Sequence, residues 1–164
     1  MRTLAVYPGS FDPPTNGHLD IIERSSLVFS RVIVAVAVNL RKDAFFTPAE
    51  RVRMLKRLTS TMGNVEVTSF QGLLVDFARA KEAHILVRGI RAISDFEYEY
   101  QMAHMNRKLD QEIDTVIMMT GERHSAISSN IVKEIAMFGG KIDDLVPPLV
   151  RDILMKKLKG AKRK

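Results

Sequence analysis

A short segment rich in glycine and proline, which ends in a histidine, is the part of the sequence best suited to chemistry. Residues 7–18 read Tyr-Pro-Gly-Ser-Phe-Asp-Pro-Pro-Thr-Asn-Gly-His, and the apolar spacing after them predicts a helix with His18 in its first turn. Backbone amides and the positive end of the helix dipole attract anions there, and an imidazole adds a hydrogen-bond donor. We therefore expect His18 to face a phosphate; the simpler alternative is a surface histidine in an ordinary turn.

The same segment lacks two well-known nucleotide-binding fingerprints. No lysine followed by serine or threonine comes after its glycines, as a Walker motif requires, and it contains no Gly-x-Gly-x-x-Gly pattern. P-loop hydrolysis and hydride transfer are therefore disfavoured.

Two further segments place cations where strands are predicted to end. Residues 39–42 read Asn-Leu-Arg-Lys, and residues 88–91 read Arg-Gly-Ile-Arg. Arginine binds phosphate oxygens through two parallel hydrogen bonds, and glycine lets the backbone approach a ligand closely. Either pair alone would suit an ordinary solvated loop, but two pairs at strand ends favour an anion-binding site.

A last candidate segment ends by opening a helix. Residues 120–130 read Thr-Gly-Glu-Arg-His-Ser-Ala-Ile-Ser-Ser-Asn. Paired hydroxyls and the amides of a helix start can cradle a phosphate, although serine also caps helices without any ligand.

Other chemistries find little support in the residue types. The sequence shows no acid pair spaced for glycoside hydrolysis, no Ser-His-Asp signature and no histidine cluster for a structural metal; His84 and His104 are expected to be structural. Phosphate binding without an evident nucleophile favours direct displacement at phosphorus, in which an enzyme works by positioning and charge stabilisation.

The elements that must position these segments alternate between strands and helices. Apolar runs predict strands at residues 4–7, 32–38, 65–67, 85–87 and 115–119. The second run is continuously apolar, as expected for a strand buried on both faces. The alternation predicts an α/β fold, a Rossmann-like five-stranded parallel sheet with helices on both faces, whose ligands bind beyond the carboxyl ends of the strands.

Several helix starts can be recognised. Capping boxes are predicted at residues 47–50 and 94–97, and Ser128 or Ser129 is expected to open a helix that ends at Gly139 and Gly140. A last amphipathic helix follows Pro147 and Pro148. The helix after residue 94 carries an apolar stripe composed of Tyr98, Met102, Met105 and Leu109.

Length and composition predict a single domain. The 164 residues are 46% hydrophobic and 27% charged, and we expect one domain over residues 1–158 with a basic tail at 159–164. The absence of cysteine excludes disulfides and thiolate metal sites. No apolar run is long enough for a membrane span and the start does not resemble a secretory signal, so a cytoplasmic protein is expected.

The net charge of +6 belongs to the end of the chain. Six basic residues follow residue 155 without an acid among them, and the rest of the chain balances 19 basic against 19 acidic residues. A basic RNA-binding protein whose tail carries the affinity is an alternative from another class. The neutral body and the scarcity of aromatic platforms disfavour it, so no nucleic-acid partner is expected.

Several of these segments resemble the nucleotidylyltransferase superfamily and, within it, the bacterial phosphopantetheine adenylyltransferase family. The superfamily pattern His- or Thr-x-Gly-His corresponds to residues 15–18, and Ile-Ser-Ser to residues 127–129, with Lys133 as the basic residue downstream. More specific to the family are residues 7–13, 88–91, 95–99 and 103–107. The resemblance runs from residue 4 to about residue 155.

The resemblance implies reversible transfer of AMP from ATP to 4′-phosphopantetheine, which gives dephospho-coenzyme A and pyrophosphate with Mg²⁺ as cofactor. It implies catalytic roles for His18, Lys42 and Arg88, with His18 stabilising charge on the transferred phosphate. The acceptor site would comprise Ser10, Lys42, Leu74 and Arg88. The ATP site would comprise Ser10, Phe11, His18, Gly89, Ile90, Arg91, Glu99, His124, Ser125, Ala126, Ile127, Ser128, Ser129 and Asn130. The resemblance also implies a homohexamer and inhibition by coenzyme A. It does not indicate which residues would bind magnesium.

Some positions depart from the family pattern. Ser10 replaces a common threonine, Asp43 and Ala44 follow Lys42 where lysine and proline are frequent, His124 replaces a common tryptophan, and Asn130 a common serine. The last two affect the expected nucleotide contacts. The alternative acceptors are nicotinamide mononucleotide or, for a cytidylyltransferase, a sugar- or polyol-phosphate; residues 88–91 and 95–99 favour pantetheine.

Overall fold

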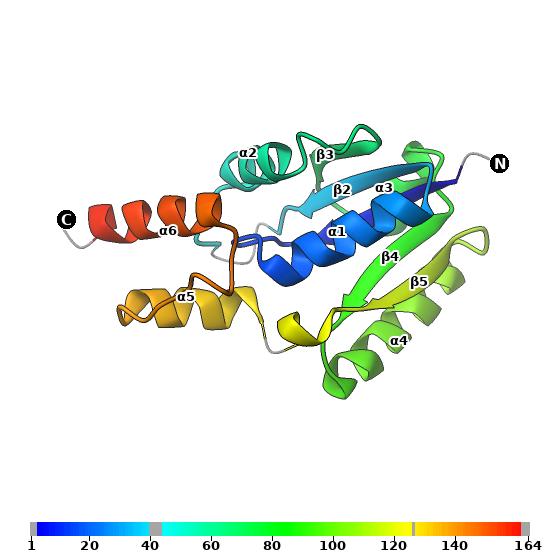
Figure 1. Ribbon diagram of the computed structural model, residues 1–164. Helices are drawn as coiled ribbons and strands as arrows, with labels where there is room; N and C mark the ends of the chain where they lie inside the picture. Colours follow the sequence, from blue (N-terminus) through cyan, green and yellow to red (C-terminus); the bar gives the residue numbers. More distant parts are fainter. Residues whose placement is uncertain (1–2, 40–43, 126, 162–164) are drawn as a thin grey trace.

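The computed structural model describes residues 3–39, 44–125 and 127–161 (Figure 1). Five parallel strands form one sheet in the order β3-β2-β1-β4-β5. Their bounds are β1 (Leu4–Gly9), β2 (Arg31–Ala37), β3 (Val65–Phe70), β4 (Ile85–Ile90) and β5 (Asp114–Met119). The five predicted strands and the parallel sheet are therefore confirmed.

Helices cover both faces of the sheet (Figure 1). They are α1 (Asn16–Val28), α2 (Pro48–Leu58), α3 (Leu74–Ala80), α4 (Ile93–Leu109), α5 (Ser129–Met137) and α6 (Pro148–Ala161), with a 3₁₀ turn at Glu122–His124. Helices α1 and α2 pack on one face, and α3 and α4 on the other. Strand β2 is buried on both sides: Val34 joins the apolar cluster under α1, and Ile33 joins the cluster under α3.

Helices α5 and α6 form a lobe beyond the carboxyl ends of the strands (Figure 1). Its apolar cluster joins Val132 of α5, Leu154 of α6 and Met54 of α2 around Phe46, whose side chain is fully buried. The lobe therefore encloses the edge of the sheet at which ligands are expected to bind.

One predicted capping box is confirmed and the other is wrong. Thr47 and Glu50 cap α2 reciprocally. Helix α4, in contrast, begins at Ile93 and its N-cap residue Ala92 offers no side chain to the helix amides. The carboxylate of Asp95, within the expected box, instead accepts hydrogen bonds from the amide and guanidinium of Arg91.

Strand β4 extends further than its apolar residues indicate. It was expected to end before residue 88, but Arg88 and Gly89 pair in register with β5 and lie inside the sheet. Of the two arginines predicted to follow this strand, Arg91 alone lies beyond its end. Gly89 permits close packing here, because a Cβ at this position would lie 3.1 Å from Cγ1 of Ile21 on α1.

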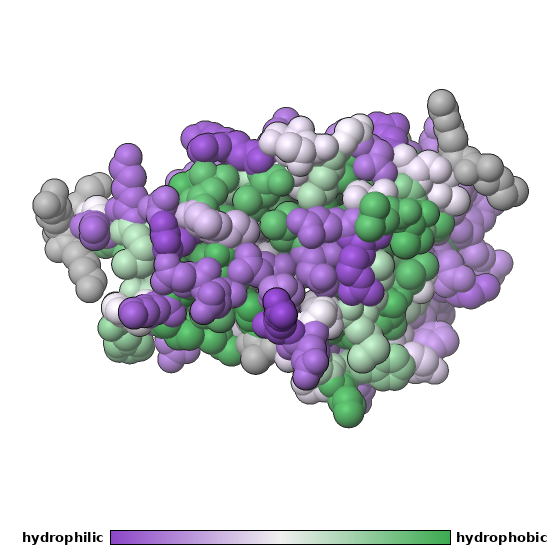
Figure 2. Space-filling view, viewed as in Figure 1, coloured by the Kyte–Doolittle hydropathy of each residue, from purple (hydrophilic) through white to green (hydrophobic). Residues whose placement is uncertain are grey.

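The apolar stripe of α4 is exposed in the monomer. Tyr98, Met102, Met105 and Leu109 all reach the surface. Hydrophobic side chains also come to the surface beside β5 and the start of α4 (Figure 2). Strand β5 is the last strand of the sheet on this side, so its outer edge has no strand partner within the described chain.

Helix α6 continues to Ala161, three residues beyond the predicted end of the domain at residue 158, and residues 162–164 lie outside the described chain. None of the helices described is long and apolar enough to cross a membrane.

Candidate active site

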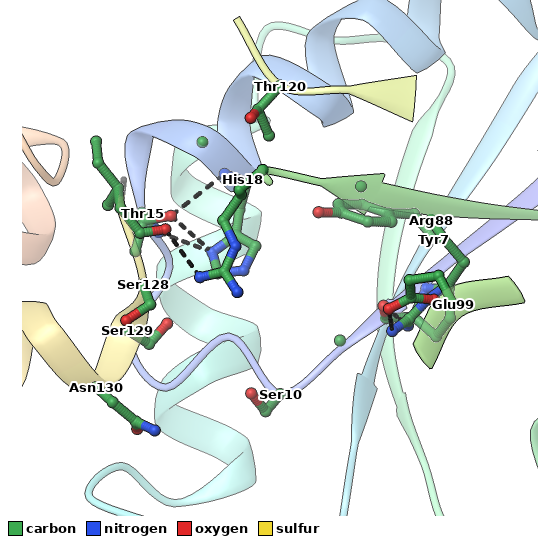
Figure 3. A pocket seen from close by; sticks show the side chains of 16 residues that line it. Tyr7, Ser10, Thr15, His18, Arg88, Glu99, Thr120, Ser128, Ser129 and Asn130 are labelled. Atoms are coloured by element: carbon green, nitrogen blue, oxygen red, sulfur yellow. Dashed lines mark hydrogen bonds and ion pairs between the residues drawn. The ribbon is translucent and has the colours of Figure 1, made fainter. Parts of the chain in front are cut away.

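A cavity of about 280 Å³ opens beyond the carboxyl ends of β1 and β4 (Figure 3). These neighbouring strands mark the point at which the strand order reverses, which is where open parallel sheets bind ligands. The cavity is lined by Tyr7, Pro8, Gly9, Ser10, Thr15, Gly17, His18, Arg88, Gly89, Arg91, Glu99, Thr120, Ile127, Ser128, Ser129 and Asn130.

His18 lies in the first turn of α1, as predicted, and its ring is part of the helix cap. Thr15 is the N-cap residue: its hydroxyl accepts a hydrogen bond from the His18 amide, and its own amide donates to Nδ1 of His18 at 3.0 Å. Because a backbone amide can only donate, Nδ1 must be the unprotonated ring nitrogen. The neutral ring therefore carries its proton on Nε2, where it can donate to an anion.

Burial, together with two nearby positive charges, keeps the ring of His18 neutral. Burial and the positive charges of Arg91 and Arg88 lower the His18 pKa from 6.5 to about 4. A neutral donor suits transition-state stabilisation, because it needs no proton transfer to adopt its active form.

The phenyl ring of Phe11 packs edge-to-face against the ring of His18. Its backbone has a positive φ of 48°, which turns the phenyl ring back between Tyr7 and His18, at centroid distances of 5.5 Å and 5.0 Å. A Cβ on Gly9 would lie 2.8 Å from this ring, so position 9 requires glycine. The side chain of Phe11 is fully buried, and the predicted ATP contact by this residue stays a prediction.

Arg88 is held by a buried carboxylate. Its Nε and Nη2 donate to the two oxygens of Glu99 at 2.6 Å each, and Nη1 donates to the carbonyl of Pro8 at 3.0 Å. Burial alone would lower the pKa of Arg88, but the bonds and charge of Glu99 outweigh it and raise that pKa above its ordinary value. The guanidinium is thus a permanent, oriented cation on the wall of the cavity (Figure 3).

Arg91 connects the two segments that follow β4 and β5. It pairs with Asp95 on α4, and its Nη1 donates to the carbonyl of Ile127 at 3.1 Å. The guanidinium therefore fixes the approach to α5 against the start of α4.

The start of α5 forms the opposite wall of the cavity (Figure 3). Ser128 is the N-cap residue and accepts from the amide of Ile131, and the hydroxyl of Ser129 donates to the carbonyl of Pro13 at 2.7 Å. The capping role is confirmed for Ser128, which also lies at the edge of the cavity, and the phosphate cradle stays a prediction. The cap uses the amide of Ile131, and the other amides at the helix start, which lack partners within the helix, are available to an anion.

The structure brings most of the predicted site residues to one place. The lining includes the predicted residues Ser10, His18, Arg88, Gly89, Arg91, Glu99, Ile127, Ser128, Ser129 and Asn130. Phe11, Leu74, Ile90, His124 and Ser125 do not line the cavity; Leu74 opens α3 and packs in the core of the other face. Lys42 and Ala126 lie outside the described residues. All these roles stay predictions.

The sequence-based list omitted several lining residues. Tyr7, Thr15 and Gly17 all lie in the glycine- and proline-rich segment at residues 7–18. The residue types in that segment do not indicate which of them face the cavity. Thr120 directly follows β5, and its hydroxyl donates to the carbonyl of Ile90. Burial raises the pKa of the Tyr7 hydroxyl well above its ordinary value, so this group remains a neutral donor at the cavity wall.

The described residues do not fit a magnesium ion held by the protein itself. No group of three or more histidine or acidic side chains in the described ranges is arranged to hold a metal. Glu99 is the one carboxylate among the lining residues that the structure describes, and Arg88 occupies both of its oxygens. Any Mg²⁺ in this cavity would have to be held by the phosphates of a substrate and by water.

We predict that His18 stays neutral in the folded protein between about pH 5 and pH 8, because its pKa is lowered to about 4. NMR of protein with ¹⁵N-labelled histidine should show an unprotonated Nδ1 across this range, and His18→Gln identifies the signal. In the unfolded chain the group takes up its proton near pH ~6.5. It therefore adds stability at neutral pH that is lost as the pH falls from about 6.5 towards 4. Titration of folded His18 near pH 6.5 would contradict the assignment.

Comparison with known proteins identifies similar sequences and a similar fold. The family model described as cytidylyltransferase-like matches residues 6–135. The phosphopantetheine adenylyltransferase of Clostridium novyi is 52% identical over 154 residues, 93% of this chain and 96% of the relative. That of Clostridium botulinum, strain Eklund 17B, is 55% identical over 152 residues, 92% of this chain and 96% of the relative.

A solved structure from Vibrio parahaemolyticus, assigned as a nicotinate-nucleotide adenylyltransferase, has the same fold. It superposes with a TM-score of 0.72 over 96% of this chain and 95% of its own, at 17% identity. Extensive identity to named relatives, a matching family model and a shared fold lead to one conclusion: the chain belongs to the phosphopantetheine adenylyltransferase family of cytidylyltransferase-like proteins.

Proposed function

We propose that this chain transfers AMP from ATP to 4′-phosphopantetheine, reversibly, by direct in-line displacement. A phosphate oxygen of the acceptor forms a bond to the α-phosphorus of ATP while the bond to the bridging oxygen of pyrophosphate breaks. The observation that carries the proposal is the convergence of neutral His18, two arginines and two helix starts on one cavity. Family membership supplies the reaction, and the cavity supplies donors where phosphate charge develops.

His18 acts in this proposal as a hydrogen-bond donor to the transferred phosphate. Its Nε2–H can point into the cavity because the Thr15 amide occupies Nδ1. The amides at the start of α5 hold the phosphates that leave as pyrophosphate. No covalent enzyme intermediate is needed, because the acceptor phosphate is itself the nucleophile.

Arg88 and Lys42 hold the acceptor phosphate in the proposed complex. Two bonds to Glu99 orient the Arg88 guanidinium, and it keeps N–H groups beyond those used by Glu99 and Pro8. Lys42 and the contact of Leu74 with the pantetheine arm rest on the family resemblance. Mg²⁺ enters with ATP, held by phosphate oxygens and water.

The remaining ATP contacts are proposed on the same basis. They comprise the lining residues Ser10, Gly89, Arg91, Glu99, Ile127, Ser128, Ser129 and Asn130 together with Phe11, Ile90, His124, Ser125 and Ala126. We also propose a cytoplasmic site of action, which suits a chain without cysteine, and inhibition by coenzyme A, which shares the pantetheine arm of the acceptor.

The acceptor is tested by pyrophosphate release from Mg–ATP. We expect release with 4′-phosphopantetheine and none above background with nicotinamide mononucleotide or glycerol 3-phosphate. Preference for one of the other acceptors would keep the fold and the role of His18 but reject the proposed substrate. The absence of release with all three would reject the activity.

His18→Ala should reduce turnover by ~10² or more, the scale seen when a donor to transition-state charge is removed. The fold should persist, since His18 is not part of an apolar core cluster. His84→Ala, which removes an exposed histidine before β4, is the matched control and should keep normal turnover. Near-normal turnover in His18→Ala would remove this residue from the mechanism.

The exposed face of α4 and β5 is proposed as a subunit interface of a homohexamer. Helix α4 presents the exposed apolar stripe Tyr98, Met102, Met105 and Leu109, and Val116 and Met119 of β5 are exposed as well. Exposed apolar area on this scale is characteristic of interfaces, and association would also cover the free edge of β5.

Met105→Lys should lower the assembly state, because it puts a charge into this apolar face. Sedimentation velocity at matched concentration would show the change, and Ser60→Lys, on the exposed turn after α2, should leave the mass unaltered. An unchanged mass in Met105→Lys would place the interface elsewhere.

A further inference from the structure

A buried carboxylate beneath the cavity gathers donors from two distant segments. Asp12, in the loop between β1 and α1, is only 6% exposed. Its oxygens accept hydrogen bonds from the amides of Phe45 and Phe46, at 2.9 Å and 2.7 Å, and from Nζ of Lys133 on α5, at 3.0 Å. This group, Asp12 with its three donors, is called the Asp12 clasp below.

The Asp12 clasp lies outside the cavity that it adjoins. Neither Asp12 nor Lys133 belongs to the described residues that line the cavity, and the side chains of the pair are 8% and 18% exposed. A second bond, from Ser129 to the carbonyl of Pro13, joins the same two segments one residue further along the loop. Helix α5 is thus attached to this loop at two adjacent points.

The two attached segments are the two walls of the cavity. The loop leads to the wall that carries His18, and α5 begins with the wall that carries Ser128 and Asn130. The clasp therefore determines how far the donor of His18 lies from the amides at the start of α5. In-line transfer depends on that separation, because the same triphosphate must reach both walls.

We propose that Lys133 is a positioning residue, which neutralises buried Asp12 and so holds the two walls at the separation that transfer requires. The inference rests on the proposed function. The competing role, direct contact with a phosphate of ATP, would require Lys133 to leave Asp12. That movement would cost buried Asp12 its ion pair at 3.0 Å and leave it only the more distant charge of Arg51, which is unfavourable.

A double-mutant cycle separates these roles. Lys133→Met and Asp12→Asn should each reduce kcat by roughly tenfold or more, because small misplacements of reacting groups are costly. The double variant should be no slower than the slower single variant, because both changes break the same clasp. The KM for ATP should stay within about twofold. Additive losses, or a large rise in the KM for ATP confined to variants lacking Lys133, would overturn the proposal in favour of direct contact.

Two control variants distinguish positioning from general stability. Lys157→Met removes a lysine–carboxylate pair in the same lobe, with Glu50 at 2.7 Å, and should keep normal kcat. Lys133→Arg preserves the charge and should recover most of the kcat lost in Lys133→Met. Thermal unfolding and circular dichroism establish that each variant is folded. Normal kcat in folded Lys133→Met, or no recovery in Lys133→Arg, would overturn the inference.

A readout without substrate keeps this test separate from the test of the reaction. If the clasp sets the position of the His18 wall, the imidazole ¹⁵N signals of His18 should shift in Lys133→Met and not in Lys157→Met. Unchanged His18 signals in Lys133→Met would reject positioning even if the wild-type enzyme is fully active. If the His18 signals shift in Lys133→Met but the unsubstituted protein releases no pyrophosphate, the clasp is supported and only the proposed reaction is rejected.

Discussion

The reversal of strand order between β1 and β4 is the constraint on which the site depends. From β1 the chain proceeds outwards through β2 and β3 on one side, and it then crosses back to add β4 and β5 on the other. The connections after β1 and β4 therefore leave the sheet in opposite directions and open a crevice between them. His18, Arg91 and the serines of α5 enter this crevice from a strand end or a helix start, whereas Arg88 comes from within β4 and Glu99 from the body of α4.

Paired charges make this crevice rigid without cancelling its attraction for phosphate. Arg88 forms an ion pair with Glu99, Arg91 with Asp95, and Lys133 with Asp12. Each carboxylate fixes a cation that would otherwise be repelled by its neighbours. His18, placed among the two arginines, avoids further repulsion by remaining neutral, so it contributes a directed dipole in place of another charge.

Sequence reasoning succeeded where the signal is local and failed where distant segments decide the outcome. The strands, the cap at Thr47 and the first-turn position of His18 follow from short-range patterns, and all were predicted correctly. The extension of β4 through Arg88 could not be predicted from apolar pattern, because pairing with β5 maintains a polar residue in the strand. Helix α4 starts before the expected cap, and Asp95 pairs with Arg91, a contact that no capping pattern indicates. The clasp around Asp12 joins three segments far apart in sequence, and no local pattern marks it.

The hydrogen bond to Nδ1 of His18 comes from the main chain at residue 15, and this has a consequence for sequence drift. Every amino acid except proline supplies the same N–H. The direction in which the imidazole donates therefore depends on the path of the loop, and the Thr15 hydroxyl adds a second contact to Nδ1 at 3.0 Å. A substitution at residue 15 that removes this hydroxyl would thus weaken the start of α1 and yet keep the peptide N–H that directs the imidazole.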